Sequence, residues 1–260
     1  MNKSETLDKI SRSDEERRLL ARVWDKAEQA RRGAPAFTPF LSESQQAATQ
    51  RLIAALGHPR HLFSGGYPGA ERKVCAFLPS WQEEDDWQTP FSALRCSWLS
   101  GEKLTHRDFL GAVLGQGIER EKVGDILVGA GSCDLLVFSE LAPYLRQNFT
   151  EAGRAKLRVE EIPLAELALP EKKVKVIHDT VNTPRLDAVF SSGFSLSRGK
   201  AADAIAAGRV EVNHVPCVKP DKTVEQGDVL TCRGLGKCVV TELGGQSKKG
   251  RTILTIERYL

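Results

Sequence analysis

The chain has 260 residues, of which 41% are hydrophobic and 27% are charged, and its formal net charge is +3. This balance excludes a disordered or collagen-like chain and provides enough apolar residues for one or two domains with their own cores. No apolar run reaches the ~20 residues of a membrane span, and the N-terminal segment is charged throughout. We therefore expect a cytoplasmic protein without a membrane partner.

The first 170 residues predict an alternation of helices and strands. Apolar spacing predicts one helix over 4–32, and Ser42 with Gln45 forms a capping box that begins a second helix ending near residue 56. Further along the chain we expect strands over 74–78, 93–99, 125–128, 135–138 and 158–162, with helices over 105–114 and 139–149. This order predicts a mixed α/β region that ends near Pro170.

The last third of the chain has a different charge and pattern. Residues 172–260 contain 15 Lys and Arg against 9 Asp and Glu, whereas residues 1–171 contain 22 against 25. A basic region on a nearly neutral body indicates a polyanionic partner for that region. Two short helices are expected, one from Arg185 to about Ser191 and one capped by Ser197 and ended by Gly208, followed by short strands around a turn at 213–214.

From Arg185 onward the chain resembles the S4 RNA-binding domain. The matching motifs are R-L-D at 185–187, S-R-G-K-A-A at 197–202, G-R-V-E-V-N at 208–213 and G-D-V-L at 227–230. Their order and spacing agree with the family over about 50 residues. One difference is His214, where the family usually has Gly, but His can also occupy a left-handed turn position.

The resemblance implies RNA contacts on this domain, because a helix N-terminus favours a phosphate and RNA is recognised through its phosphates and shape. The expected contacts are Arg185, Arg198 and Lys200, supported by Arg209, Lys219, Lys237 and Asn213. Other roles stay open for some of these residues and for Asp187. Asp187 can pair with an arginine or cap its helix, Arg209 can close the preceding helix, and Lys237 can be an ordinary loop lysine.

Two further strings narrow the resemblance. Residues 65–73 (GGYPGAERK) and 105–120 (THRDFLGAVLGQGIER), the latter followed by G-D-I at 124–126, resemble the bacterial YlmH-type S4-domain RNA-binding proteins. Membership implies an α+β fold with an N-terminal α/β part over 1–80, an RRM-like part over 81–170 and an S4 domain over 171–260. It also implies binding to structured rRNA on the large ribosomal subunit, tRNA as a further candidate partner, ribosome-associated quality control and a link to cell division.

Residues outside the S4 motifs give weaker indications. His106, Arg107 and Asp108 are consecutive in a predicted helix and so do not share one face. Arg107 and Arg120 are either a second RNA surface or salt-bridging surface groups. The six cysteines form no C-x-x-C pair and no zinc-finger spacing, so we expect buried free thiols and no metal site.

Two other function classes compete with RNA binding alone. Pseudouridine synthases use an Asp in an R-L-D setting similar to 185–193, but here the glycine comes one residue late and only about 70 residues follow. No glycine-rich cofactor loop of a methyltransferase is present. The other alternative is a cell-division adaptor that uses the acidic N-terminal body. We expect a non-enzymatic protein with no cofactor and no small-molecule substrate.

Overall fold

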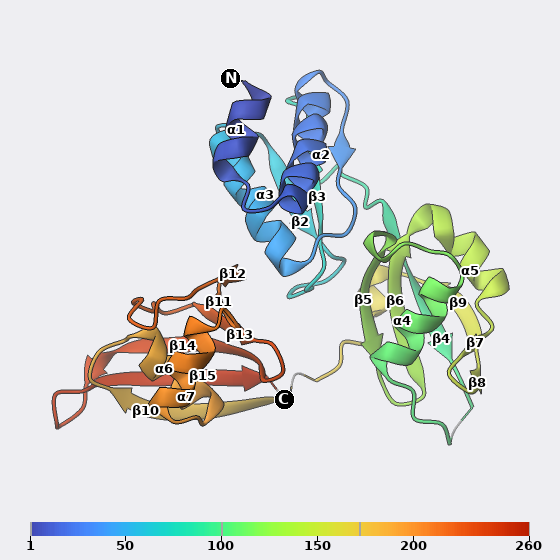
Figure 1. The fold of residues 1–260 in the computed structure, drawn as a ribbon. Helices are drawn as coiled ribbons and strands as arrows, with labels where there is room; N and C mark the ends of the chain where they lie inside the picture. The colour runs from blue at the N-terminus through green and yellow to red at the C-terminus, as the bar shows by residue number, and fades with distance from the viewer. Residues whose placement is uncertain (1, 100, 172, 260) are drawn as a thin grey trace. The chain divides into compact units, whose positions relative to one another are not determined.

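The structure is a computed structural model that describes residues 2–99, 101–171 and 173–259. The chain forms two compact units, residues 1–170 and 171–260, which Figure 1 colours from blue to yellow and from yellow to red. Each unit has hydrophobic cores of its own. Over the described ranges, no helix is long and apolar enough to cross a membrane.

The N-terminal part of the first unit packs helices onto a small antiparallel sheet. Its elements are α1 (Lys3–Ile10), α2 (Asp14–Arg31), β1 (Ala36–Phe37), α3 (Glu43–Ala55), β2 (His61–Ser64) and β3 (Val74–Phe77). The strand order is β1–β3–β2. Leu20 of α2 and Leu52 of α3 are fully buried in one core with Phe77 of β3, which explains why these helices carry apolar stripes.

The single helix predicted over 4–32 is wrong, because the chain breaks between α1 and α2. Ser11 and Ser13 have extended backbone, and the Ser13 hydroxyl accepts a hydrogen bond of 3.1 Å from the Glu16 amide. Ser13 and Glu16 have the S-x-x-E spacing that begins a helix. The capping box predicted at Ser42 and Gln45 is confirmed at the start of α3.

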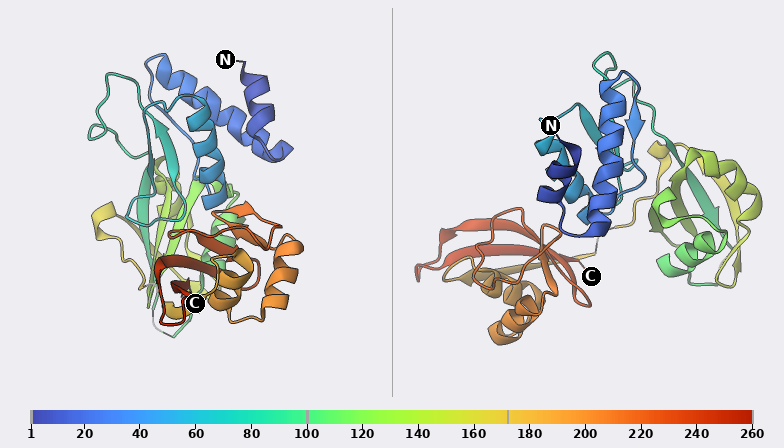
Figure 2. Two further views of the ribbon diagram at one scale, coloured as in Figure 1. Left: turned by 90° about the vertical axis from the view of Figure 1, so that its left-hand side faces the viewer. Right: turned by 45° about the horizontal axis from the view of Figure 1, so that its top comes forward.

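The second part of the first unit has the βαββαβ order of an RRM-like fold. Its main elements are β4 (Phe91–Ser97), α4 (His106–Gly115), β5 (Val123–Val128), β6 (Ser132–Phe138), α5 (Ala142–Asn148) and β9 (Arg158–Ile162). The strand order is β5–β6–β4–β9, and α4 and α5 cover one face of this sheet (Figure 2). The shorter elements are η1 (Arg120–Lys122), η2 (Ser139–Leu141), β7 (Glu151–Ala152), β8 (Ala155–Lys156) and η3 (Leu164–Glu166).

The other face of this sheet packs against the N-terminal part. Phe91 and Leu136 point to the side opposite the helices and join Phe40 and Val74 in a buried cluster. The rings of Phe40 and Phe91 lie 5.1 Å apart between centroids. The two parts of the first unit therefore share a core, and the boundary expected near residue 80 stays a prediction.

Asp125 ties together the two strings that gave the family resemblance. Its carboxylate accepts hydrogen bonds from the Tyr67 hydroxyl at 2.7 Å and from the backbone amides of Glu71 and Arg72 at 2.8 and 3.0 Å. The loop over 65–73 is thereby fixed to β5. These strings have a structural role, since they hold the N-terminal part onto the RRM-like sheet.

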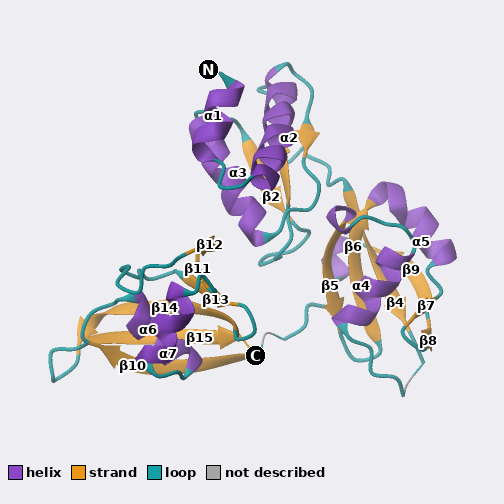
Figure 3. Cartoon of the chain, viewed as in Figure 1, coloured by secondary structure: helices purple, strands orange, loops and turns teal. Residues whose placement is uncertain are grey.

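The second unit places two helices on one face of an antiparallel sheet (Figure 3). Its elements are β10 (Val174–Val181), α6 (Leu186–Phe194), α7 (Arg198–Ala206), β11 (Val210–Val212), β12 (Val215–Pro216), β13 (Val229–Cys232), β14 (Gly236–Gln246) and β15 (Thr252–Tyr259). The strand order is β10–β15–β14–β13–β11–β12. Leu186, Phe190 and Ile205 of the helices pack on Leu254 and Ile256 of β15.

The two short helices on a sheet agree with the fold expected for an S4 domain. The second unit also contains strands that were not expected. α6 extends to Phe194, beyond the predicted end near Ser191. β10, β14 and β15 were not predicted, and Lys237, which was expected in a loop, lies in β14. These strands form one side of the sheet through the pairing of β10 with β15 and of β15 with β14. The fold class is α+β, as expected.

Candidate nucleic-acid interface

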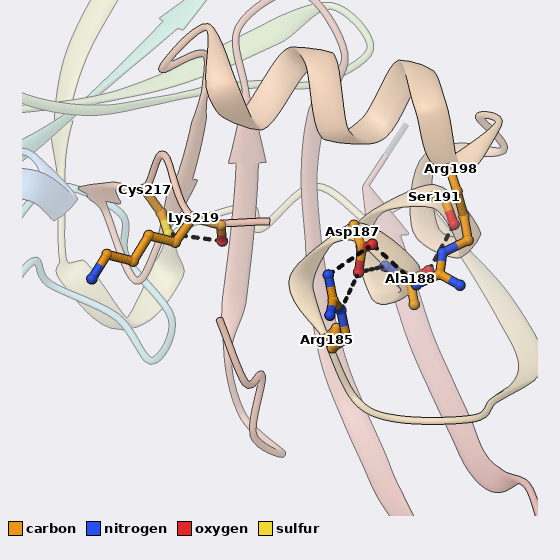
Figure 4. Close-up of polar contacts among 7 residues, drawn as sticks. All are labelled: Arg185, Asp187, Ala188, Ser191, Arg198, Cys217 and Lys219. Atoms are coloured by element: carbon orange, nitrogen blue, oxygen red, sulfur yellow. Dashed lines mark hydrogen bonds and ion pairs between the residues drawn. The ribbon is translucent and has the colours of Figure 1, made fainter. Parts of the chain in front are cut away.

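Asp187 holds two arginines together at the starts of α6 and α7. Arg185 is the N-cap residue of α6, and Arg198 is the first residue of α7. Nε of Arg185 donates to Oδ1 of Asp187 over 3.2 Å, and Nη2 of Arg198 donates to Oδ2 over 3.0 Å. Figure 4 shows these contacts from both guanidiniums to the carboxylate between them. We call Arg185, Asp187 and Arg198 the Asp187 cluster.

The charges of the Asp187 cluster are arranged for an external anion. The Asp187 side chain is only 12% exposed, whereas those of Arg185 and Arg198 are 43% and 59% exposed. Burial works against the charged form, but the hydrogen bonds from both arginines and their charges outweigh it and hold the pKa of Asp187 below its ordinary value. A guanidinium carries five N–H donors. Each arginine is thus oriented by Asp187 and still faces solvent with further donors.

Helix α7 begins and ends with local contacts that place cations around it. The Ser197 hydroxyl accepts a hydrogen bond of 3.3 Å from the Lys200 amide, so the predicted N-cap is confirmed. At the other end, Gly208 has φ +68°, and the amides of Gly208 and Arg209 donate to Ile205 and Ala204. This is a Schellman motif. Arg209 closes the helix with its backbone and leaves its side chain exposed.

A groove of about 450 Å³ runs between α7 and the turn that follows β13. We call it the α7 groove. Its cations are Lys200, Arg209 and Arg233, and Asp203 is the one acid among the residues that line it. Its remaining lining is Leu196, Ala204, Cys232, Gly234 and Leu235. A groove with this excess of positive charge suits phosphate oxygens, which RNA-binding proteins contact through Lys and Arg.

Lys219 and Lys237 are not part of the Asp187 cluster or of the α7 groove lining. Lys219 is exposed after β12 and precedes Pro220, whose carbonyl accepts a hydrogen bond of 2.9 Å from the Asp187 amide. Figure 4 shows its side chain pointing away from Arg185 and Arg198. Lys237 is half-buried on β14, with its Nζ 5.1 Å from the centroid of the Tyr259 ring. The predicted contacts therefore divide between the Asp187 cluster, the α7 groove and two further lysines.

Asn213 has a structural role in the turn between β11 and β12. Asn213 and His214 have φ of +52° and +61°, so the expectation that His can occupy this left-handed turn is confirmed. The Asn213 amide group donates to Asp228 at 2.7 Å, and its oxygen accepts from the Val229 amide at 2.9 Å. Both polar ends of the side chain are used inside the domain, and an RNA contact by Asn213 stays a prediction.

The proposed second pair, Arg107 and Arg120, occupies different environments in the first unit. Arg107 is exposed on α4. Arg120 is half-buried, and its Nη1 donates to the carbonyls of Val123, at 2.5 Å, and Gly124, at 3.2 Å. The neighbouring Arg72 also donates to the Val123 carbonyl. Burial, together with the charge of Arg120, lowers the pKa of Arg72. Arg120 thus supports the backbone at β5.

The aromatic rings on the face of the RRM-like sheet opposite the helices are covered in this structure. RRM domains stack bases on aromatic side chains of the sheet face opposite the helices. Here the N-terminal part covers the end of that face that carries Phe91, which is 2% exposed, and Phe138, which is 5% exposed. Neither of these two rings is therefore available on the sheet face for a base to stack on.

The sequence did not single out Arg233 or the tip of the β14–β15 hairpin. Arg233 follows the recognised S4 motifs, and only the fold brings it opposite Lys200 and Arg209. Lys248, Lys249 and Arg251 are exposed between the ends of β14 and β15. Their signal was present as a basic stretch without acids over 243–252, but the strands that project it were not predicted.

Family models match a segment of each unit. The family model described as "Putative RNA-binding domain in YlmH" matches residues 84–166, and the S4 domain model matches residues 184–230. The Bacillus subtilis (strain 168) protein named ribosome-associated protein quality control protein P2 is 36% identical over 200 residues, which are 75% of this chain and 77% of that protein. A structure named cell division protein ylmH from Streptococcus pneumoniae is 26% identical, covering 60% of this chain and 96% of that one at a TM-score of 0.49.

Proposed function

The chain belongs to the YlmH family of S4-domain proteins, and from this membership we propose that it is a non-enzymatic protein that docks structured rRNA on the ribosome. The proposed place is the large subunit, with a stalled peptidyl-tRNA as a further contact, in ribosome-associated quality control. The name of the Bacillus subtilis relative supports the quality-control role. A protein with this partner acts in the cytoplasm.

The observation that carries the proposal is the pairing of two cationic sites on the second unit. The α7 groove presents Lys200, Arg209 and Arg233, and the Asp187 cluster presents Arg185 and Arg198. Both sites involve α7, whose length is nine residues. Phosphates on one RNA strand repeat within a few ångströms of each other, so neighbouring cationic sites on one helix fit a structured RNA backbone.

Asp187 also bears on the enzyme alternative. A catalytic Asp needs a carboxylate oxygen that can reach its substrate. Here Oδ1 accepts from Arg185 and from the Ala188 amide, and Oδ2 accepts from Arg198. These contacts favour a carboxylate that positions arginines over one that attacks a base.

The test is a binding titration of the full chain with a large-subunit rRNA fragment over a range of salt concentrations. The variant Lys200→Gln/Arg209→Gln/Arg233→Gln removes the cations of the α7 groove. We expect the slope of log affinity against log salt to fall by about one for each lost phosphate contact. Wild-type affinity that does not depend on salt would contradict phosphate binding.

A matched control has the same change in net charge at other exposed cations. Lys9→Gln/Arg12→Gln/Arg32→Gln alters cations in and beside α1 and α2, all exposed. We expect this control to keep most of the wild-type affinity and slope. Equal losses in both triple variants would show that net charge alone, without the α7 groove, determines binding.

A further inference from the structure

The first unit has a groove that is separate from the S4 surface and largely outside the residues that the RNA-binding family models match. Its volume is about 270 Å³, and it lies between α2, β1 and the ends of η1 and β6. The lining residues are Leu19, Arg22, Val23, Lys26, Phe37, Thr38, Pro39, Lys122 and Phe138. We call it the Phe37 groove. It combines aromatic rings with three cations and no acid among its lining residues.

Phe37 is the exposed end of a short aromatic stack. Its ring lies 5.9 Å from that of Phe138 at an interplanar angle of 27°, and Lys122 lies 5.0 Å from the Phe138 centroid. Phe138 is nearly buried, whereas Phe37 is 39% exposed. A planar group that stacks on Phe37 would extend this arrangement, and nucleobases stack on aromatic side chains in this way.

The cations of the Phe37 groove suit a phosphate beside such a base. Lys26 is half-buried, and among the described contacts it has neither an ion pair nor a hydrogen bond. Arg22 has only a 3.4 Å contact with Glu121, and Lys122 pairs with Glu140 at 2.6 Å. Lys26 is therefore the cation with the most capacity for an external anion, and it lies in the same groove as Phe37.

We propose that the Phe37 groove binds an unpaired RNA nucleotide, whose base stacks on Phe37 and whose phosphate contacts Lys26. This inference rests on the proposed RNA-binding function and assigns the first unit a contact of its own. Phe91 and Phe138 on the sheet face that RRM domains use are buried here, and Phe37 is the exposed ring that stacks on Phe138.

Other occupants fit the groove less well. Pockets for discrete small molecules usually measure about 300–1,000 Å³ and enclose most of the ligand, whereas this groove is smaller. An acidic peptide would find the same cations, but an added strand needs a long edge, and β1 has two residues. The Thr38 hydroxyl is already bonded to the Pro39 carbonyl and the Cys75 amide. Rings and cations are what the groove offers, and a nucleotide uses both.

The test compares two RNAs on the full chain: a blunt rRNA hairpin, and the same hairpin with a single-stranded 3′ extension. We expect Phe37→Leu and Lys26→Gln to weaken binding of the extended RNA, with Phe37→Leu costing about tenfold, as expected for the loss of one base stack. Both variants should bind the blunt hairpin like the wild type. Phe37→Tyr should keep the affinity for the extended RNA, since it retains the ring.

Control variants separate stacking from general effects. Trp81 is a 66% exposed aromatic outside the groove, and Trp81→Leu should leave both affinities unchanged; Lys9→Gln is the matched control for Lys26→Gln. Unchanged binding of the extended RNA by Phe37→Leu would overturn the inference while the S4-based function stands. Binding of neither RNA by the wild type would overturn both. Phe37-dependent binding of poly-glutamate, without Phe37-dependent binding of RNA, would assign the groove to an acidic peptide instead.

Discussion

We expect Asp187 to strengthen RNA binding, although its negative charge alone would weaken it. It carries a negative charge on a surface proposed to bind a polyanion, yet it orients Arg185 and Arg198. Arginines that are already held in one geometry lose less conformational entropy when they bind. The carboxylate therefore acts through the two guanidiniums.

The variant Asp187→Asn tests this role. It makes the chain one unit more positive, so net charge alone predicts tighter RNA binding. We predict binding weaker by about threefold to tenfold, or about 0.7–1.4 kcal/mol, because the arginines lose their common anchor. An rRNA titration at constant salt measures it. Tighter binding would contradict the positioning role, and conversion of uridine by the wild type that is absent in the variant would establish the enzyme alternative.

The stability of the same variant shows whether the cluster is intact. Because the folded pKa of Asp187 is lowered, its contribution to stability is complete above the unfolded pKa of about 3.9 and is lost as pH falls through the folded value. We expect Asp187→Asn to be less stable by about 1–2 kcal/mol at pH 7, allowing for the exposure of both guanidiniums. In urea unfolding, this difference should narrow below about pH 4.

At the scale of single residues, features set by neighbouring sequence were predicted, whereas features set by contacts distant in the sequence were not. The caps Ser42 and Ser197 follow from spacing within one turn of helix, and both are present. The buried free thiols are also confirmed, with burial raising the pKa of Cys96 to about 12. The partners of Asn213, Asp228 and Val229, lie 15 and 16 residues along the chain, so its structural role was not visible in the sequence. Arg120 contacts the nearby Val123 and Gly124 carbonyls, but only the fold shows that it is half-buried there.

At the scale of elements, strand pairing was the hardest feature to predict. β10 pairs with β15 between residues 174–181 and 252–259, and no local pattern reports a partner over 70 residues away. β14 also contains two irregularities in its register with β15, which interrupt the alternation of inward and outward side chains. The S4 helices and the β11–β12 turn were predicted because their caps and turn residues are local.

Strand β5 depends on a glycine at position 124, because the side chains of the neighbouring core lie close to its backbone there. An added Cβ at this position in β5 would lie 2.8 Å from the Phe40 ring and 2.9 Å from Leu136. Both neighbours belong to the core that joins the two parts of the first unit. The glycine allows β5 to pack against this core, which explains its place in the G-D-I string.

We predict that Gly124→Ala lowers the stability of the first unit by about 1–3 kcal/mol, the usual cost of overpacking a core. Thermal unfolding of the full chain should show a lower transition temperature. The control is Gly111→Ala in α4, where an added Cβ meets nothing within 4 Å. Since alanine favours a helix over glycine, the control should be neutral or stabilising. An unchanged transition for Gly124→Ala would contradict the packing described for β5.

At the scale of the whole molecule, charge and fold divide at the same place. The basic third of the sequence coincides with the second unit, residues 171–260. Composition alone indicated a polyanionic partner there. The α7 groove needed the fold, because Arg233 joins Lys200 and Arg209 only after the sheet is formed. In the first unit, the N-terminal part likewise covers the aromatic rings on the sheet face that the RRM-like order would assign to RNA.

The most direct test of ribosome docking is co-sedimentation of the full chain with separated ribosomal subunits over a salt series. Wild type is compared with Lys200→Gln/Arg209→Gln/Arg233→Gln. We predict that the wild type pellets with the large subunit at low salt and is released as salt rises, because phosphate contacts are screened. The variant should remain in the supernatant at salt concentrations where the wild type pellets. A wild type that pellets with neither subunit, or a folded variant that pellets like the wild type, would contradict docking through the α7 groove.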